Sequence, residues 1–158
     1  MRSSFTEFGH SHLAVLVTTA LLPLALAGVA RLLPGKKFAR AVSLTFAAEL
    51  IATWILWFGL ILVRGWISMA TVLPMNLCDW ATIATTVTLL GSGRKTFELA
   101  YFWTFSGTLQ ALITPELYYD FPDLRFIVFF AFHGGTIAAV CFLCSRAASG
   151  RVLPECRG

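Results

Sequence analysis

The chain has 158 residues, of which 58% are hydrophobic and 13% are charged, and its mean hydropathy is +0.78. A water-soluble domain of this length needs far more surface charge, so the composition excludes the soluble classes of protein. The net charge of +4 comes from residues that flank apolar stretches, which is typical of membrane helices and does not indicate a nucleic-acid partner. We therefore expect membrane lipids as partners and no nucleic acid.

Five apolar stretches predict five membrane helices, because about 20 residues at 1.5 Å each cross a hydrocarbon core of about 30 Å. The third stretch is broken by Pro74 and carries Asp79, so we expect an approach along the interface and a helix that begins near Pro74. The predicted fold class is all-α, a polytopic transmembrane helix bundle over 1–145, followed by a short polar tail over 146–158. The stretches are 12–33, 42–63, 67–90, 97–113 and 126–144.

Basic residues in the short loops predict the orientation, because such residues are held on the cytoplasmic side. Nine of the twelve lie on one side of the alternating topology. We therefore expect a multi-pass protein of the cell membrane with its N-terminus outside and its C-terminus in the cytoplasm. A rival interpretation takes 12–33 as a cleaved signal peptide, but its basic residues mostly follow the apolar stretch instead of preceding it. The nine are Arg31, Lys36, Lys37, Arg40, Arg94, Lys95, Arg146, Arg151 and Arg157.

Four cysteines raise the question of a disulfide framework or a metal site. Cys141 and Cys144 have the spacing of one half of a zinc ligand set, but no second Cys or His pair lies on the same side of the membrane. They are therefore interpreted as small buried thiols, kept free by a reducing cytoplasm. We expect neither a metal nor a disulfide.

Several polar residues lie inside the predicted helices, where each is costly unless it faces a partner or a water-filled cavity. These residues lie at similar depths in the membrane. His133 lies eight residues beyond Arg125, which places it about 12 Å below the outer surface, and the others also fall in the outer half of the bilayer. The set consists of Cys78, Ser106, Gln110 and His133, together with His10 and the candidate supporting residue His12 where the first helix enters the membrane.

A thiol and an imidazole in contact form a nucleophile and its general base, which is the chemistry of acyl transfer. Cys78 is the candidate nucleophile and His133 the candidate base. Gln110 or Ser106 is expected to orient the ester or to donate to an oxyanion. Asp79 follows Cys78 directly but points about 100° away on a helix, so we expect it to pair elsewhere.

Two acidic residues lie outside this hypothesis. Glu98 is predicted near the cytoplasmic start of the fourth helix beside Arg94 and Lys95, where the helix dipole stabilises an acidic side chain, so its role is interpreted as structural. Glu49 lies about two turns inside the membrane. We expect its carboxyl to be protonated or paired, with a proton-linked role as an alternative.

Several sequence runs resemble the YwaF-like family of bacterial integral membrane proteins in order and in spacing. That family is similar to a eukaryotic transmembrane acyltransferase that moves polyunsaturated acyl chains between phospholipids. It is more distantly similar to the androgen-induced membrane hydrolases that cleave fatty-acid esters of hydroxy fatty acids. The runs are Leu73 to Cys78, Tyr101 to Trp103, Ser106 to Pro115, Leu124 to Phe126, Phe129-Phe130 and His133 to Gly135.

The resemblance implies an intramembrane nucleophile at Cys78 with His133 as its partner, and it gives Gln110 no role. Members of that family usually continue through one or two further hydrophobic segments, whereas 145–158 is polar. Three consequences are open: the site is open to lipid, a second copy or a partner chain replaces the helices, or the chain is inactive.

Three functional hypotheses remain. The first is a phospholipid acyltransferase or lipid ester hydrolase that works through a thioester on Cys78. The second is a non-enzymatic membrane protein, such as a small transporter subunit or an assembly factor, in which His133, Gln110 and Asp79 form a packing network or a solute path. The third has His12 and His133 as axial ligands of a haem. The first two require no cofactor, and we expect none.

Overall fold

The computed structural model describes residues 4–32, 36–69, 73–74 and 76–148. Within these residues the chain forms helices and no strand, apart from an isolated bridge between Ser4 and Tyr119. The predicted all-α class is therefore confirmed. Most of the predicted tail, including Cys156, lies outside the described residues.

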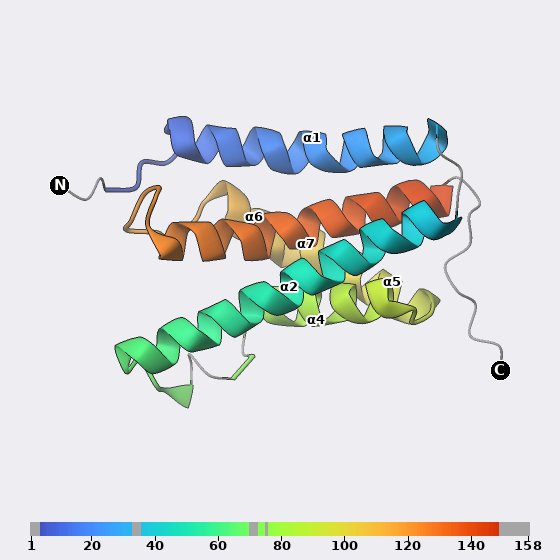
Figure 1. Cartoon of the computed structure of the whole chain (residues 1–158). Helices are drawn as coiled ribbons and strands as arrows, with labels where there is room; N and C mark the ends of the chain where they lie inside the picture. Colours follow the sequence, from blue (N-terminus) through green and yellow to red (C-terminus); the bar gives the residue numbers. More distant parts are fainter. Residues whose placement is uncertain (1–3, 33–35, 70–72, 75, 149–158) are drawn as a thin grey trace.

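Consecutive helices run in alternating directions along the bundle (Figure 1). α5, η1 and α6 follow one another without a break and form one helix with a π-helical middle, so the described residues contain the five predicted helices. By length and composition α1, α2 and α7 can each cross a membrane, whereas α4 is a shorter apolar helix. The bounds are α1 His10–Leu32, α2 Lys36–Arg64, α4 Leu77–Leu90, α5 Arg94–Trp103, η1 Thr104–Thr108, α6 Leu109–Ile113 and α7 Leu124–Ala148.

The ends of α4 and α6 follow from local sequence signals. α4 begins at Leu77, three residues later than Pro74, because Asn76 takes the extended N-cap conformation. It ends at Leu90 and is capped by Gly91, whose φ of 127° favours glycine. α6 ends at Ile113, directly before Thr114 and the proline that follows, as predicted.

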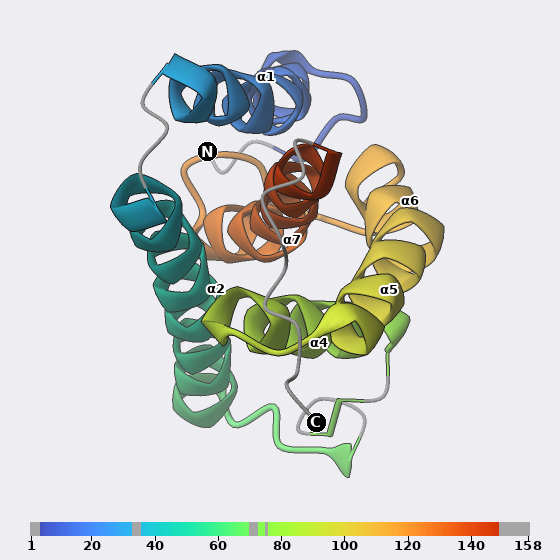
Figure 2. The same ribbon diagram turned by 90° about the vertical axis from the view of Figure 1, so that its right-hand side faces the viewer.

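α7 is the central helix, and the other helices surround it (Figure 2). In the apolar 18-residue segment of α7, 61% of the residues are buried, against 11% in the corresponding segment of α1 and 28% in that of α2. The main core cluster joins α7 to α2: the rings of Phe142 and Phe46 lie 6.1 Å apart, and Leu50 and Ala47 belong to the same cluster. Any residue on the inner faces of α7 is therefore enclosed by protein, while α1 and α2 present most of their side chains to lipid.

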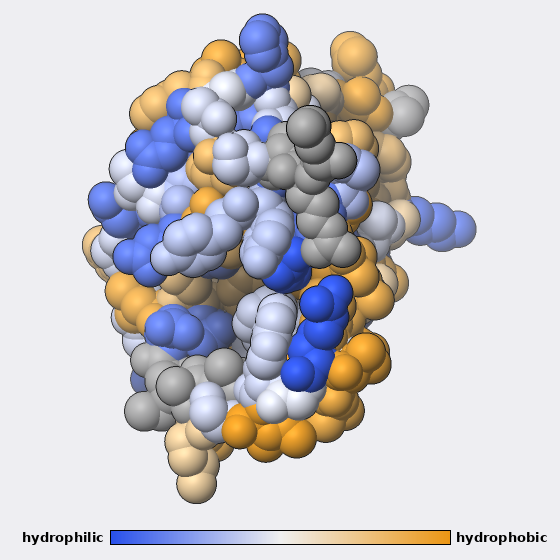
Figure 3. Space-filling model, turned by 90° about the vertical axis from the view of Figure 1, so that its left-hand side faces the viewer, coloured by the Kyte–Doolittle hydropathy of each residue, from blue (hydrophilic) through white to orange (hydrophobic). Residues whose placement is uncertain are grey.

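Hydrophilic residues gather on the end of the bundle where α1 and α7 begin, and hydrophobic residues border that end (Figure 3). A polar end bordered by apolar sides fits a bilayer, because only the ends of a membrane bundle meet water. Which end faces the cytoplasm stays a prediction from the basic residues.

Candidate functional site

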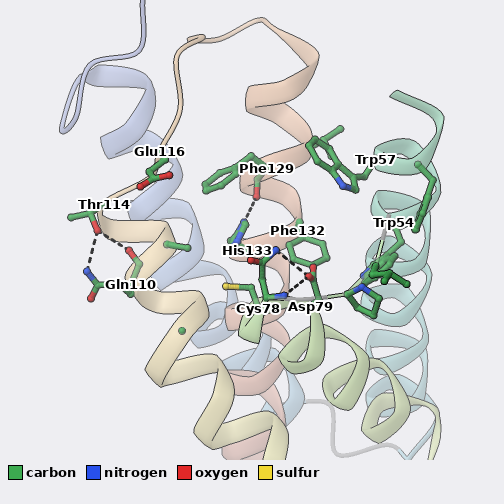
Figure 4. A pocket seen from close by; sticks show the side chains of 17 residues that line it. Trp54, Trp57, Cys78, Asp79, Gln110, Thr114, Glu116, Phe129, Phe132 and His133 are labelled. Carbon is green, nitrogen blue, oxygen red and sulfur yellow. Dashed lines mark hydrogen bonds between the residues drawn. The ribbon is translucent and has the colours of Figure 1, made fainter. Parts of the chain in front are cut away.

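A cavity of about 790 Å³ lies between α2, α4, α6 and α7. Its volume falls in the range of ligand pockets, roughly 300–1,000 Å³. Four of the predicted site residues, Cys78, Asp79, Gln110 and His133, line it together, although they come from three different helices (Figure 4). The remaining walls are mostly aromatic or apolar and include Trp54, Trp57, Phe58, Pro74, Phe129 and Phe132, with Asn76, Thr114 and Glu116 as further polar members.

His133 is buried in α7, and its ring is held in one orientation. Its Nδ1 lies 2.8 Å from the carbonyl oxygen of Phe129, one turn earlier. A carbonyl only accepts, so Nδ1 carries the proton, and in the neutral ring Nε2 is the acceptor. The rings of Phe129 and Phe132 pack against the imidazole with centroids 4.2 and 5.1 Å away. The contact with the helix backbone uses only Nδ1 of His133, so Nε2, the nitrogen that can take a proton, is left unused by this contact.

Cys78 is half-buried in the first turn of α4, and its neighbours fix that turn. Oδ2 of Asp79 accepts hydrogen bonds from the backbone N–H of Asn76 at 3.1 Å and from its side-chain amide at 3.2 Å. Asp79 thus satisfies amide groups at the helix N-terminus. This agrees with the expectation that Asp79 pairs elsewhere than with Cys78. By stabilising the first turn of α4, Asp79 helps to position the Cys78 thiol.

The π-helical turn brings Gly107 and Thr108 against the start of α4. A Cβ at Gly107 would lie 3.0 Å from Cδ2 of Leu77, so glycine permits this close approach. The Thr108 hydroxyl is fully buried without an oxygen or nitrogen partner among the described residues, and the thiol of Cys78 lies beside it. Thr108 was not among the predicted site residues, although a hydroxyl inside an apolar stretch beside Gly107 was a signal for it.

Gln110 and Ser106 do not share one environment. Gln110 lines the cavity and donates from Nε2 to the Thr114 hydroxyl at 3.2 Å. Ser106 is exposed, is not among the residues that line the cavity, and donates to the carbonyl of Phe102 at 2.7 Å. The expectation assumed an α-helical register, whereas the π turn spaces its hydrogen bonds five residues apart and shifts the faces. The structure therefore does not bring Ser106 to the predicted site.

His12 is fully buried, away from the cavity walls, and both of its ring nitrogens are occupied. The backbone N–H of Phe8 donates to Nδ1 at 3.0 Å, so Nε2 carries the proton and donates to the carbonyl of Leu112 at 2.9 Å. A ring used in this way has no lone pair for a metal or a haem iron. His12 instead joins α1 to α6, which removes it from the supporting role and from the haem hypothesis.

The two acidic residues outside the main hypothesis differ in their surroundings. Glu98 forms an exposed ion pair with Arg94 at 2.8 Å, as expected for a structural role. Glu49 accepts from the Thr53 hydroxyl at 3.1 Å, while its second oxygen is buried without a partner among the described residues and faces Gly135. No group of three or more His, Cys, Asp or Glu residues that could hold a metal is found in the described ranges.

Comparison with known proteins assigns the chain to a family. The model of the TMEM164 family matches residues 7–151, which include all five helices and every residue of the cavity. No curated protein and no solved structure matches the chain. The comparison does not reach the YwaF-like family or an acyltransferase, so that resemblance and the roles it implies stay predictions.

Proposed function

Since this chain belongs to the TMEM164 family of transmembrane proteins, we propose that it is a membrane acyltransferase in which Cys78 carries the acyl group. The observation that supports this proposal is that a thiol and an imidazole line one cavity. The thiol of Cys78 and the imidazole of His133 line the same space, and the Nδ1 contact with Phe129 leaves Nε2 as a proton acceptor.

In the first half of the reaction Nε2 of His133 takes the proton of the Cys78 thiol. The thiolate attacks the carbonyl carbon of a phospholipid ester and forms a carbon–sulfur bond. The resulting oxyanion collapses, the ester carbon–oxygen bond breaks, and His133 returns its proton to the departing oxygen. A lysophospholipid leaves, and the acyl chain remains on Cys78 as a thioester.

In the second half a hydroxyl group of an acceptor lipid replaces the lysophospholipid. His133 takes the hydroxyl proton, the oxygen attacks the thioester carbon, and the carbon–sulfur bond breaks as the thiol regains a proton. Water in place of the acceptor turns the same steps into ester hydrolysis. A proton-transfer residue of this kind contributes about 10²–10⁴ in rate.

The other polar groups suit an ester substrate. Gln110 presents an amide at the cavity wall, where it can orient the head group, and Thr108 places a hydroxyl beside the sulfur. α4 begins next to Cys78, and a helix N-terminus stabilises negative charge that develops near it. Under this proposal the chain works as a multi-pass protein of the cell membrane and draws lipid from the outer leaflet.

Intact-protein mass spectrometry tests the proposal directly. The chain is purified with lipid, incubated with mixed phospholipids and washed with hydroxylamine, and Cys78→Ala is treated in parallel. We expect a mass increment of one acyl group that the wash removes and that the variant lacks. If both proteins keep the unmodified mass, the thioester mechanism is wrong.

A buried polar network supports a second, non-enzymatic candidate. The hydroxyls of Thr82 and Thr136 lie 2.9 Å apart between α4 and α7, and Glu49 lies against Gly135 of α7. Such contacts can hold a bundle together without any chemistry. The variant Cys78→Ser discriminates between the two candidates. A protein held together by a packing network tolerates the substitution, whereas the acyltransferase loses turnover while its fold survives.

A further inference from the structure

A second hollow continues from the cavity along the outside of the bundle. This groove has a volume of about 750 Å³ and lies between α2 and α4. It shares Trp54, Phe58 and Pro74 with the cavity that holds Cys78. Because these three residues belong to both walls, one ligand can occupy both spaces without leaving the protein surface.

The two spaces differ in chemistry. The cavity carries the polar and ionisable groups Cys78, Asp79, Gln110, Glu116 and His133. The groove is apolar except for one threonine. A ligand that fits both spaces therefore has one polar end and one long apolar end, which describes a membrane lipid and not a compact solute or a peptide helix.

The direction of the groove matches an extended chain. Asp79 lines the cavity, and Ile83 and Val87, four and eight residues further along the same face of α4, line the groove. The groove therefore runs lengthwise beside α4, and Val87 lies roughly 14 Å from Cys78 along the helix axis. On the facing helix Ile55 and Leu62 are each 66% exposed, so the groove opens sideways to lipid.

We propose that the groove between α2 and α4 binds the acyl chain of a membrane lipid whose ester group lies at Cys78. The inference rests on the proposed function for the ester at Cys78. It adds the route of entry, between α2 and α4, and the residues that determine which chains fit. Gly59 is central among them, because it lines the groove and a Cβ placed on it would meet no atom within 4 Å.

A matched pair of glycine variants tests the groove. Gly59→Phe fills it, while Gly28→Phe places the same ring on α1, where an added Cβ also meets nothing. The probe is a phosphatidylcholine with a photoreactive diazirine at the end of one acyl chain, added in trace amounts to the detergent-solubilised protein. Labelled peptides are identified by mass spectrometry, with unlabelled phosphatidylcholine as competitor.

We expect competed labels on residues 51–62 and 83–87 in the wild type and in Cys78→Ala. Labelling should fall roughly tenfold in Gly59→Phe, because each displaced methylene contributes about fourfold to binding and the ring displaces about two. Gly28→Phe should label like the wild type. Equal labelling of the two glycine variants would overturn the proposal. It would also be overturned if Gly59→Phe lost dimers but labelled like the wild type, because a second copy of the chain would then be the occupant of the groove. Ile55→Phe repeats the test if Gly59→Phe does not fold.

A second readout separates this inference from the proposed function. The Cys78 acyl adduct is measured with short-chain and with long-chain phosphatidylcholines. We expect Gly59→Phe to lose the long-chain adduct and to keep the short-chain one. Absence of any adduct in the wild type contradicts the proposed function alone, because the photolabel reports on the groove without chemistry. An adduct whose chain-length dependence is the same in the wild type and in Gly59→Phe contradicts the groove.

Discussion

The imidazole of His133 is oriented by its own helix, since Nδ1 lies 2.8 Å from the carbonyl oxygen of Phe129. This contact uses the nitrogen that faces the backbone and keeps the other nitrogen as an acceptor in the ring's neutral form. An orienting partner behind the base is the recurring arrangement in nucleophilic catalysis, where a carboxylate usually supplies it. Here a main-chain carbonyl takes that place, so no acidic residue is needed.

Replacing the base should slow acylation without unfolding the protein. In His133→Gln we expect the rate of Cys78 adduct formation to fall about 10²–10⁴-fold, the usual contribution of a general base. The rate is followed by intact mass over time. His10→Gln is the control, because His10 is exposed at the start of α1 and does not line the cavity. An unchanged rate in His133→Gln would show that the ring takes no part in the proton transfer.

The helices could be predicted from sequence because the bilayer itself dictates their length and composition. Stretches of 17 to 24 apolar residues have few alternatives to a membrane helix, and the ends of α1, α2 and α7 differ from the predicted ends by one to six residues. The shared depth of Cys78, Gln110 and His133 was also available, since helical rise converts sequence position into depth.

The parts that sequence did not reveal depend on contacts between distant residues. Ser106 was misplaced because α-helical periodicity does not contain the π turn, in which Gly107 closely approaches Leu77 of α4. The role of His12 depends on the carbonyl of Leu112, 100 residues away. The cap formed by Asn76 and Asp79 is different, because their spacing is a local signal that was visible in the sequence.

Thr108 is expected to influence the reactivity of the thiol and not the stability of the fold. Its hydroxyl can donate to the thiolate, and losing a hydrogen bond to a charged group costs about 1.5–3 kcal/mol, or about tenfold or more in reactivity. In Thr108→Val, alkylation of Cys78 by iodoacetamide should therefore slow by about that factor. The melting temperature should stay unchanged, because valine keeps the shape and removes a hydroxyl without an oxygen or nitrogen partner among the described residues.

Thr104→Val is the matched control for Thr108→Val. Thr104 is also fully buried in the π turn with an unpartnered hydroxyl, within the part of the chain that the structure describes, but the Cys78 thiol lies beside Thr108 and not beside Thr104. Equal alkylation rates in the two variants would mean that the Thr108 hydroxyl does not act on the sulfur.

His12 should behave as a structural residue. His12→Phe keeps a buried ring but leaves the N–H of Phe8 and the carbonyl of Leu112 unpaired, at about 1–3 kcal/mol for each buried group. We expect a lower melting temperature in detergent and an unchanged acylation rate per folded molecule. The exposed His10 provides the comparison, since His10→Phe should change stability by less than about 0.5 kcal/mol. A stable His12→Phe protein that has lost activity would instead return His12 to the site.

The contact between Glu49 and Gly135 gives a test of how tightly α2 packs on α7. A Cβ at Gly135 would lie 3.0 Å from Cδ of Glu49 and closer still to its buried oxygen, so Gly135→Ala should destabilise the bundle by about 1–3 kcal/mol. Adding Glu49→Ala removes the obstructing carboxyl, so the double variant should regain most of that loss, measured as a coupling energy in a double-mutant cycle. Gly59→Ala, with open space around its Cβ, should stay near the wild type. Additive losses in the double variant would show that the loss in Gly135→Ala does not come from a clash with the Glu49 carboxyl.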